Sequence, residues 1–157
     1  NFTIWNRSPA GAQAFAKATG AAVAVDLEPA VGAADIILTC TTSTEPIIKG
    51  VWLRPGQHLN MIGAYRPDMR EADDEVLQKS LLFVDSFDTT LGHIGELKIP
   101  LETGVITREH VQADYYNLAA FQARPEDITV FKNGGGAHLD LMTARYVLDQ
   151  WQGLKST

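Results

Sequence analysis

The sequence predicts an α/β protein built on a doubly wound parallel sheet. Short apolar runs alternate with helical segments along the whole chain, which is the pattern of strands joined by crossover helices. Some of these runs are apolar throughout, as in strands covered on both faces. Because 157 residues with 45% hydrophobic and 20% charged side chains have the size and composition of one globular domain, we expect a single domain over residues 1–157.

The first part of the chain carries clear start and stop signals for helices. Ser8 is a good N-cap with Pro9 at the first helical position, Gly20 ends that helix, and Asp26 can cap the next one. The unbroken apolar centre of residues 35–41 predicts a strand buried on both faces. We therefore expect strands at residues 2–5, 21–25 and 35–41, and helices at residues 10–19 and 27–31.

The second part continues the alternation after a polar loop and turn at residues 42–57. An acidic first turn at residues 73–75 favours a helix start there. The segment 107–123 is predicted to be helical, with a break near Tyr115. We expect strands at residues 58–62, 81–85 and 128–132, helices at residues 73–79 and 137–150, and a helical turn at residues 88–93.

Composition narrows the classes of partner. A formal charge of −6 with a pI near 5.1 argues against nucleic acids and anionic membranes, so a small-molecule partner is expected. No apolar run approaches the ~20 residues needed to span a bilayer. The single cysteine, Cys40, cannot form an internal disulfide, which favours a cytoplasmic location, and we expect it to be a buried strand residue. The histidines at positions 58, 93, 110 and 138 lack ligand spacing, so no metal site is predicted.

Small or polar residues follow the predicted strands. In a Rossmann-type sheet the dinucleotide lies across the carboxyl ends of the strands, where these residues stand. An acidic residue after the second strand binds the adenosine ribose, whereas an arginine suits a 2′-phosphate. If residues 2–5 form that second strand, Arg7 favours NADP over NAD; the alternative is a solvated loop cation. The residues after the strands are Asn6-Arg7-Ser8, Thr41-Thr42-Ser43, Gly63-Ala64-Tyr65, Asp85-Ser86 and Asn133-Gly134-Gly135-Gly136.

Glycines mark two of these strand ends. Gly63 has no Cβ, so a flat ring could approach its backbone, although an ordinary strand-to-loop exit explains it equally well. The glycines at positions 134–136 are interpreted as a close-approach turn near a cofactor ring, with a helix-capping turn of equal weight. No G-x-G-x-x-G fingerprint occurs anywhere, so the first Rossmann strand and its glycine-rich turn are not recognisable in the chain.

The chain resembles the dinucleotide-binding domain of the ornithine cyclodeaminase/mu-crystallin family. The resemblance rests on the order and spacing of many short matches, because each alone is weak. The matching segments are Ile4-Trp5-Asn6-Arg7-Ser8-Pro9, Ala34-Asp35-Ile36-Ile37, Thr41-Thr42-Ser43-Thr44-Glu45-Pro46-Ile47, residues 50–56, Gly63-Ala64, Pro67-Asp68-Met69-Arg70-Glu71, Val84-Asp85-Ser86, Gly95-Glu96-Leu97, Gly104-Val105-Ile106 and Ile128-Thr129-Val130-Phe131-Lys132.

The resemblance implies a larger, two-domain enzyme. Such an enzyme has a substrate and dimerisation domain formed by both chain ends, with the Rossmann domain between them. In that scheme this chain begins at the second Rossmann strand, so the first strand and the glycine-rich turn would lie upstream. Residues 2–5 and 35–41 would then flank an empty strand position rather than pair with each other. The complete enzyme would be a homodimer through the missing domain.

The resemblance also implies roles for particular residues. The adenosine end of the cofactor would meet Asn6, Arg7 and Ser8, and Thr41 would lie along its path. The nicotinamide would lie by Ile62, Gly63, Ala64, Asn133 and Gly134. In cyclodeaminases the residue two positions after that first glycine is an aspartate that handles a proton. Here it is Tyr65, and phenols ordinarily have a pKa of about 10.

The replacement of the aspartate by Tyr65 favours the imine-reducing members of the family. We therefore expect an NAD(P)H-dependent oxidoreductase, with NADP preferred and NAD possible, that moves a hydride to or from the α-carbon of an amino or cyclic imino acid. A small ketimine such as a pyrroline or piperideine carboxylate would be the substrate. The alternatives are an ornithine cyclodeaminase, which forms proline and ammonia, and a cofactor-binding protein without catalysis.

Overall fold

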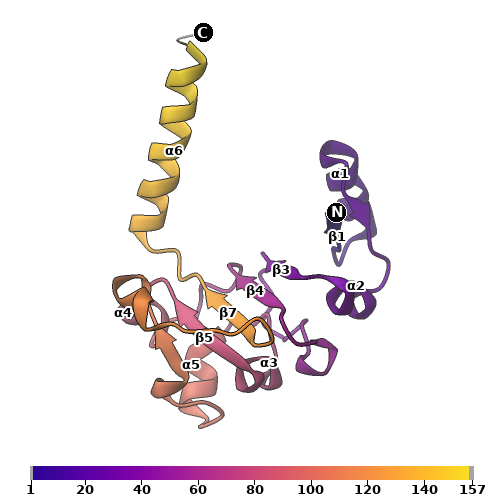
Figure 1. The fold of residues 1–157 in the computed structure, drawn as a ribbon. Coiled ribbons are helices and arrows are strands. Elements are labelled where there is room, and N and C mark those ends of the chain that lie inside the picture. The colour runs from indigo at the N-terminus through magenta and orange to yellow at the C-terminus, as the bar shows by residue number, and fades with distance from the viewer. Residues whose placement is uncertain (1, 156–157) are drawn as a thin grey trace.

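The structure is a computed structural model that describes residues 2–155. Figure 1 shows a central sheet with two arms, an N-terminal unit and a C-terminal helix. The strands are β1 (Thr3–Ile4), β2 (Ala22–Val23), β3 (Ile36–Thr39), β4 (His58–Met61), β5 (Ser80–Val84), β6 (Val111–Ala113) and β7 (Ile128–Lys132). The helices are α1 (Pro9–Thr19), α2 (Leu27–Ala33), α3 (Asp74–Lys79), α4 (Phe87–Thr90), α5 (Gly95–Glu102) and α6 (Ala137–Lys155). Three 3-10 helices are η1 (Gly50–Trp52), η2 (Arg108–His110) and η3 (Tyr115–Ala120).

All strand pairs are parallel, which confirms the predicted fold class. The main sheet has the order β3-β4-β7-β5-β6, and β1 pairs with β2 in a separate two-stranded sheet. Met61 is in register with Thr39 on one side and Lys132 on the other, so β3, β4 and β7 end at the same level. The residues that follow these three strands therefore share one edge of the sheet.

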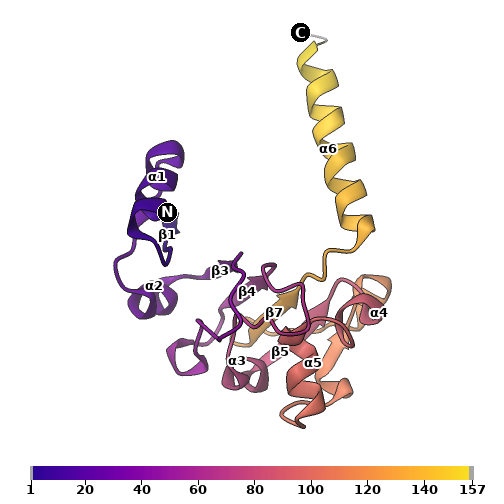
Figure 2. The same cartoon turned by 180° about the vertical axis from the view of Figure 1, so that it is seen from behind.

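The hydrophobic core lies between the main sheet and the helices on one of its faces. Leu59, Met61 and Val130 contribute from the strands and are fully buried, together with Leu77 of α3 and Leu97 of α5. Both α3 and α5 lie on this side of the sheet in the two opposite views (Figures 1 and 2). On the other face Phe83 and Phe131 stack, with ring centroids 4.8 Å apart, and Phe121 packs on Phe83 at 4.6 Å.

The outer face of β3 differs from the prediction. Ile36 is 70% exposed and Leu38 55% exposed, whereas Ile37 and Thr39 are buried. The prediction that residues 35–41 form a strand covered on both faces is therefore wrong for the described chain. An apolar run shows only that the side chains of a strand are apolar. Whether its second face is covered depends on segments that are distant in the sequence. Cys40, expected to be buried, is exposed for the same reason.

Most helices begin and end where their local signals predict. Ser8 Oγ accepts from Gly11 N at 3.4 Å at the start of α1, and Gly20 closes that helix with φ 78°. Asp73 caps α3 by accepting from Val76 N at 3.0 Å. Asp26 precedes α2 without a side-chain cap bond.

The segment 107–123 is not a helix. It contains η2, the edge strand β6 and η3, and it is preceded by α5, which was not predicted. Asp114 redirects the chain after β6, because its side chain accepts from the main-chain N–H groups of Tyr116 and Asn117 at 3.0 and 3.1 Å. Pro100 lies inside α5 and weakens its helical signal.

The N-terminal unit of β1, α1 and β2 stands apart from the main sheet (Figure 2). Strand β1 pairs with β2 and strand β3 pairs with β4, so β1 and β3 are not hydrogen-bonded neighbours. Such pairing would have contradicted the placement of residues 2–5 at the second Rossmann strand.

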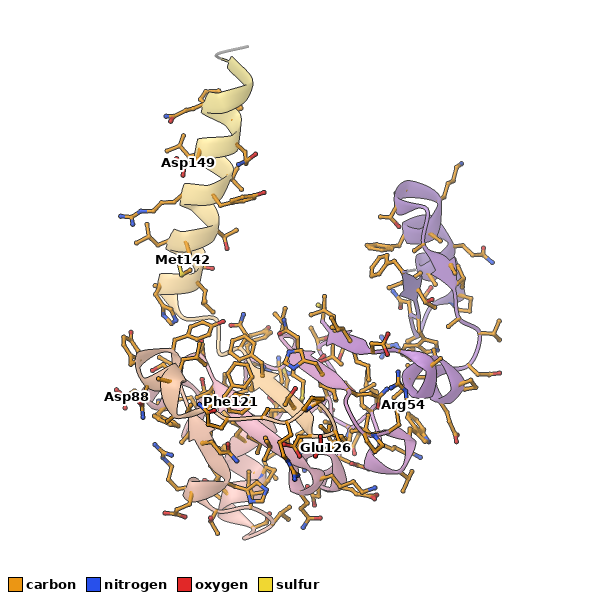
Figure 3. All side chains as sticks on the ribbon, in the orientation of Figure 1. Arg54, Asp88, Phe121, Glu126, Met142 and Asp149 are labelled. Carbon is orange, nitrogen blue, oxygen red and sulfur yellow. The ribbon has the colours of Figure 1, made fainter. Side chains whose placement is uncertain are left out.

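Helix α6 projects from the sheet on the same side as the N-terminal unit but at the other end, and it carries exposed apolar side chains, among them Met142 at 64% (Figure 3). Among residues 2–155, no helix is both long enough and apolar enough to cross a membrane.

Candidate functional site

The carboxyl ends of β3, β4 and β7 gather most of the predicted site residues. Main-chain bonds join the three exits: Ile62 N donates to Thr39 O at 2.9 Å, and Asn133 N donates to Met61 O at 3.0 Å. The predicted residues brought together at this edge are Thr41, Ile62, Gly63, Ala64, Asn133 and Gly134.

A buried carboxylate, Glu71, joins the exits of β3 and β4. Its Oε1 accepts from Thr41 N at 2.6 Å and from Thr41 Oγ1 at 2.9 Å. Its Oε2 accepts from Thr39 Oγ1 and Gly63 N, both at 2.8 Å, and from Ala64 N at 3.4 Å. Both carboxylate oxygens are therefore engaged within the protein, and the side chain of Thr41 is committed to Glu71.

Gly63 is required by this arrangement. A Cβ at Gly63 would overlap the main chain of Thr41 and the carboxylate of Glu71. The close approach that the glycine permits is thus occupied by the protein itself, which supports the alternative of an ordinary strand exit. Next to it, Ile62 presents an apolar side chain that is 40% exposed.

Lys132, the last residue of β7, is fully buried beneath the same edge. Its Nζ donates to Met61 O at 3.1 Å, Ala64 O at 2.7 Å and Asn133 O at 2.8 Å. Burial lowers the pKa of Lys132, and the nearby carboxylates of Glu96, Glu71 and Asp85 oppose that shift.

Asp85 performs a similar task after β5. Its Oδ1 accepts from Ser86 N at 2.9 Å and Thr90 Oγ1 at 2.7 Å, and its Oδ2 accepts from Gly136 N at 3.2 Å. A Cβ at Gly134 would lie 2.5 Å from Thr90 Oγ1. The glycine run therefore packs against the β5 exit as it enters α6, which supports the alternative of a helix-capping turn over a close approach to a cofactor ring.

Glu96 forms a second layer behind Glu71. It accepts from Glu71 N at 2.6 Å and from Ala72 N at 3.1 Å, and it is fully buried. Burial raises the pKa of Glu96 to about 7, against the two main-chain N–H groups and the positive charges of Arg70 and Lys132.

Tyr65 stands exposed at the β4 exit. Its side chain is 61% accessible, and Arg66 Cζ lies 6.0 Å from its ring centroid. Arg66 also pairs with Asp68, with Nε 3.1 Å from Oδ1. The phenol is thus free to meet a ligand from the solvent side.

Asn6, Arg7 and Ser8 belong to the N-terminal unit and are not joined to the other site residues by strand pairing. Asn6 Oδ1 accepts from Ser8 N at 3.0 Å, and Ser8 caps α1. These two side chains shape the start of the helix, whereas Arg7 is exposed.

The buried charges were missed as functional candidates. Lys132 had a usable signal: it ends an apolar strand and shares a face with Val130, so alternation directs it into the core. The hydrogen-bond partners of Glu71 and Glu96 are main-chain groups or residues distant in the sequence. No spacing of residues in the sequence could therefore predict these partners.

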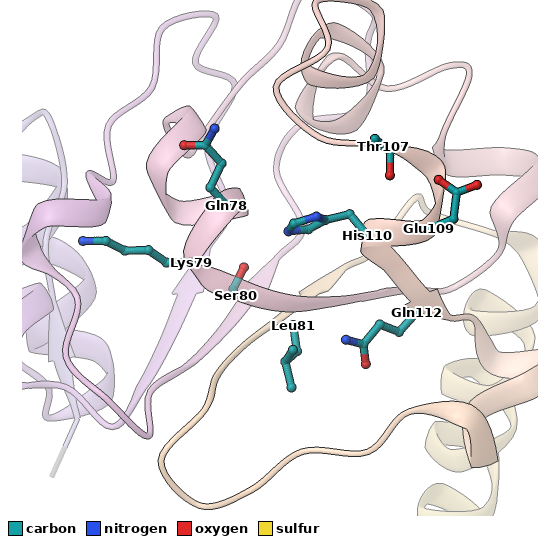
Figure 4. Close-up of a pocket in the computed structure, with 8 residues that line it drawn as sticks. All are labelled: Gln78, Lys79, Ser80, Leu81, Thr107, Glu109, His110 and Gln112. Carbon is teal, nitrogen blue, oxygen red and sulfur yellow. The ribbon is translucent and has the colours of Figure 1, made fainter.

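The residues at this edge offer a ligand both polar and apolar contacts. They combine the partly exposed Thr41 and Asn133 with the apolar Ile62 beside an accessible strand exit. Within residues 2–155, no group of three or more His, Cys, Asp or Glu side chains could hold a metal ion. A separate polar hollow lies near Ser80 and His110, at the amino end of β5 (Figure 4). It is therefore at the end of the strand opposite to the carboxyl edge.

The parallel sheet with small residues at its carboxyl edge defines a Rossmann-like α/β domain. A profile of the ornithine cyclodeaminase/mu-crystallin family matches residues 1–155, and the chain belongs to that family. It is 49% identical over 154 residues to Delta(1)-pyrroline-2-carboxylate reductase of Paracoccus denitrificans, covering 92% of this chain and 49% of that protein. It is 37% identical over 156 residues to ketimine reductase mu-crystallin of Mus musculus, covering 97% and 48%.

Solved structures of similar proteins have the same fold as this chain. Delta(1)-pyrroline-2-carboxylate reductase of Thermococcus litoralis, in complex with NADH and L-proline, superposes with a TM-score of 0.82 at 33% identity, over 91% of this chain and 47% of that one. An archaeal alanine dehydrogenase dimer with bound NAD has a TM-score of 0.80 at 27% identity, over 98% and 50%. The chain spans about half the length of the relatives it matches.

Proposed function

We propose that the chain is the dinucleotide-binding part of an NAD(P)H-dependent reductase that acts on small cyclic ketimines such as pyrroline-2-carboxylate. The cofactor supplies the hydride. The chain holds the nicotinamide end at the edge formed by β3, β4 and β7, and Tyr65 meets the substrate at the β4 exit. Similarity to two ketimine-reducing relatives supports the substrate class.

The observation that carries the proposal is the side chain at the β4 exit. By the resemblance to the family, Tyr65 stands where cyclodeaminases have an aspartate. Two carboxylates that hold the strand exits, Glu71 and Asp85, are buried and accept hydrogen bonds through both oxygens. Neither is available to exchange a proton with a substrate, so reduction is favoured over ammonia loss.

We infer a preference for NADP from Arg7. Its exposed guanidinium follows β1, where it can bind a 2′-phosphate, and no acidic residue occupies that strand end. The unphosphorylated cofactor remains the alternative, because two similar solved structures carry NADH and NAD.

The domain arrangement is also a proposal. Among the described residues β1 and β3 share no strand partner, so we propose that a further strand lies between them in the complete protein. By the complete protein we mean this chain together with the part equivalent to the other half of its relatives. That part would supply the pyrophosphate-binding turn, the substrate carboxylate site and a homodimer interface.

Steady-state assays of the complete protein test the proposed reaction. Net oxidation of NADPH with Δ1-pyrroline-2-carboxylate, and formation of L-proline, is the expected result. Proline and ammonia formed from L-ornithine without net change of the cofactor would instead identify a cyclodeaminase. Cofactor binding without either reaction would identify a binding protein.

A further inference from the structure

We propose that Lys132 is a positioning residue for the nicotinamide: its ammonium fixes the main chain on both sides of the ring site by holding the carbonyls of Ala64 and Asn133. This role rests on the proposed function. The proposed role explains why a charged side chain is buried at the carboxyl edge of the sheet.

The geometry leaves Lys132 no other role in the chemistry. Its ammonium has three N–H donors, and each is directed at one main-chain carbonyl, of Met61, Ala64 and Asn133. The side chain is 0% exposed. It therefore has neither access to a substrate nor a free N–H with which to protonate one.

The carbonyls that Lys132 binds belong to different strand exits. Met61 ends β4, Ala64 follows the Ile62-Gly63 turn, and Asn133 follows β7. Met61 O also accepts from Asn133 N at 3.0 Å, so its pairing survives without the lysine. Ala64 and Asn133 are the residues whose carbonyls depend on the ammonium, and they stand on the two sides of the predicted ring site.

Loss of the ammonium would therefore act on the site before it acts on the fold. Buried carbonyls without a donor turn towards water, which would move the β4 and β7 exits relative to each other. A displacement of about 1 Å at a hydride-transfer site can lower the rate by ~100-fold. The adenosine end, bound through the N-terminal unit, would be unaffected.

Gln57 provides a matched control at the opposite end of β4. It is also 0% exposed, and its side chain also makes three bonds to the main chain. Its Nε2 donates to Val31 O at 2.8 Å and Ala34 O at 2.6 Å, and its Oε1 accepts from Arg54 N at 2.8 Å. Gln57→Met and Lys132→Met thus remove equal numbers of buried bonds with the same replacement.

The experiment compares the complete wild-type protein with both variants at a temperature where all are folded. One arm measures kcat, KM and the primary isotope effect with NADPH deuterated at the transferred position. A second arm, independent of turnover, measures the enhancement of bound NADPH fluorescence and the Kd of adenosine 2′,5′-bisphosphate, which probes the adenosine end alone.

Lys132→Met is expected to lower kcat by about 10- to 100-fold, raise the isotope effect and lose most of the fluorescence enhancement, with the Kd of the bisphosphate within about twofold of wild type. Gln57→Met is expected to lose stability, although less because no buried charge is removed, and to keep all these quantities. Equal effects of the two variants, or a loss of stability alone in Lys132→Met, would overturn the positioning role.

The proposed function can fail separately. If the wild-type protein binds NADPH but reduces no cyclic ketimine, the reaction is wrong and the fluorescence arm alone decides the role of Lys132. If it binds neither NADPH nor NADH, both the function and the positioning role are overturned.

Discussion

The buried carboxylate of Glu71 and the buried ammonium of Lys132 hold the same residue, Ala64, from its two polar sides. Glu71 Oε2 accepts from Ala64 N at 3.4 Å, and Lys132 Nζ donates to Ala64 O at 2.7 Å. Opposite charges thus fix one short main-chain segment, which leads directly to Tyr65. The main chain at Ala64 is therefore held rigidly, and the side chain of Tyr65 that follows it is open to solvent.

Removing the charge of Glu71 should destabilise the protein strongly. In Glu71→Gln one carboxylate oxygen becomes an NH₂ group that faces N–H donors, which cannot pair with it. We expect the free energy of unfolding, measured in urea, to fall by about 2 to 4 kcal/mol. Asp68→Asn is the control, because its ion pair with Arg66 is exposed, and a loss below about 1 kcal/mol is expected there. Similar losses in both variants would show that the Glu71 cluster contributes little.

Gly63 should tolerate no side chain. The Cβ of Gly63→Ala would overlap Thr41 and Glu71, so one of the two strand exits must move. A loss of at least about 2 kcal/mol in unfolding free energy is expected. Gly92→Ala adds the same methyl group where no heavy atom lies within 4 Å, and it should be nearly neutral. A neutral Gly63→Ala would mean that the β3 and β4 exits are not packed as described.

Stability should depend on pH through Glu96. Burial raises its pKa in the folded protein to about 7 from an ordinary 4.5, so the folded state holds the proton more tightly than the unfolded state. Its contribution is therefore fully present below pH 4.5 and is lost as the pH rises through about 7. Relative to Glu96→Gln, which does not titrate, the wild type should lose on the order of 2 to 3 kcal/mol between pH 4.5 and 8. Urea unfolding of both proteins across this range would contradict the prediction if their difference stayed constant.

Local signals predicted the elements whose determinants are local. Helix α1 has its cap, its first-turn proline and its terminal glycine within the sequence that forms it. Strand β6 has three residues at the edge of the sheet, too few for an alternation pattern, and Pro100 concealed α5. These elements depend on packing against β5 and the core.

The same distinction applies to the site. The carboxyl ends of parallel strands meet at one edge by geometry, so Thr41, Gly63 and Asn133 could be placed together from the sequence. The role of Glu71 could not, because its partner Thr41 lies 30 positions away and donates partly through its main chain. A hydrogen bond to a main-chain group can be made by any residue type, so the sequence does not reveal it.

Arg7 should decide the choice of cofactor in the complete protein. Arg7→Asp replaces a cation that can pair with the 2′-phosphate, so the Kd of NADPH should rise by about 10- to 100-fold. The Kd of NADH should change much less. Lys17→Asp makes the same change of charge on the exposed last turn of α1 and serves as the control. Fluorescence titrations showing equal losses for NADPH and NADH would reduce Arg7 to a loop cation.

The outer face of β3 tests whether a further segment of the complete protein packs over this side of the sheet. Leu38 is 55% exposed on the face of β3 opposite the buried Ile37 and Thr39. If another segment covers this region in the complete protein, Leu38→Asp buries a charge and should cost at least about 3 kcal/mol of unfolding free energy. Val51, which is 66% exposed on η1, is the matched control, and Val51→Asp should cost less than about 1 kcal/mol. Urea unfolding of the complete protein that gave small and equal changes for the two variants would mean that the face of β3 stays open to solvent, and that no segment lies over it.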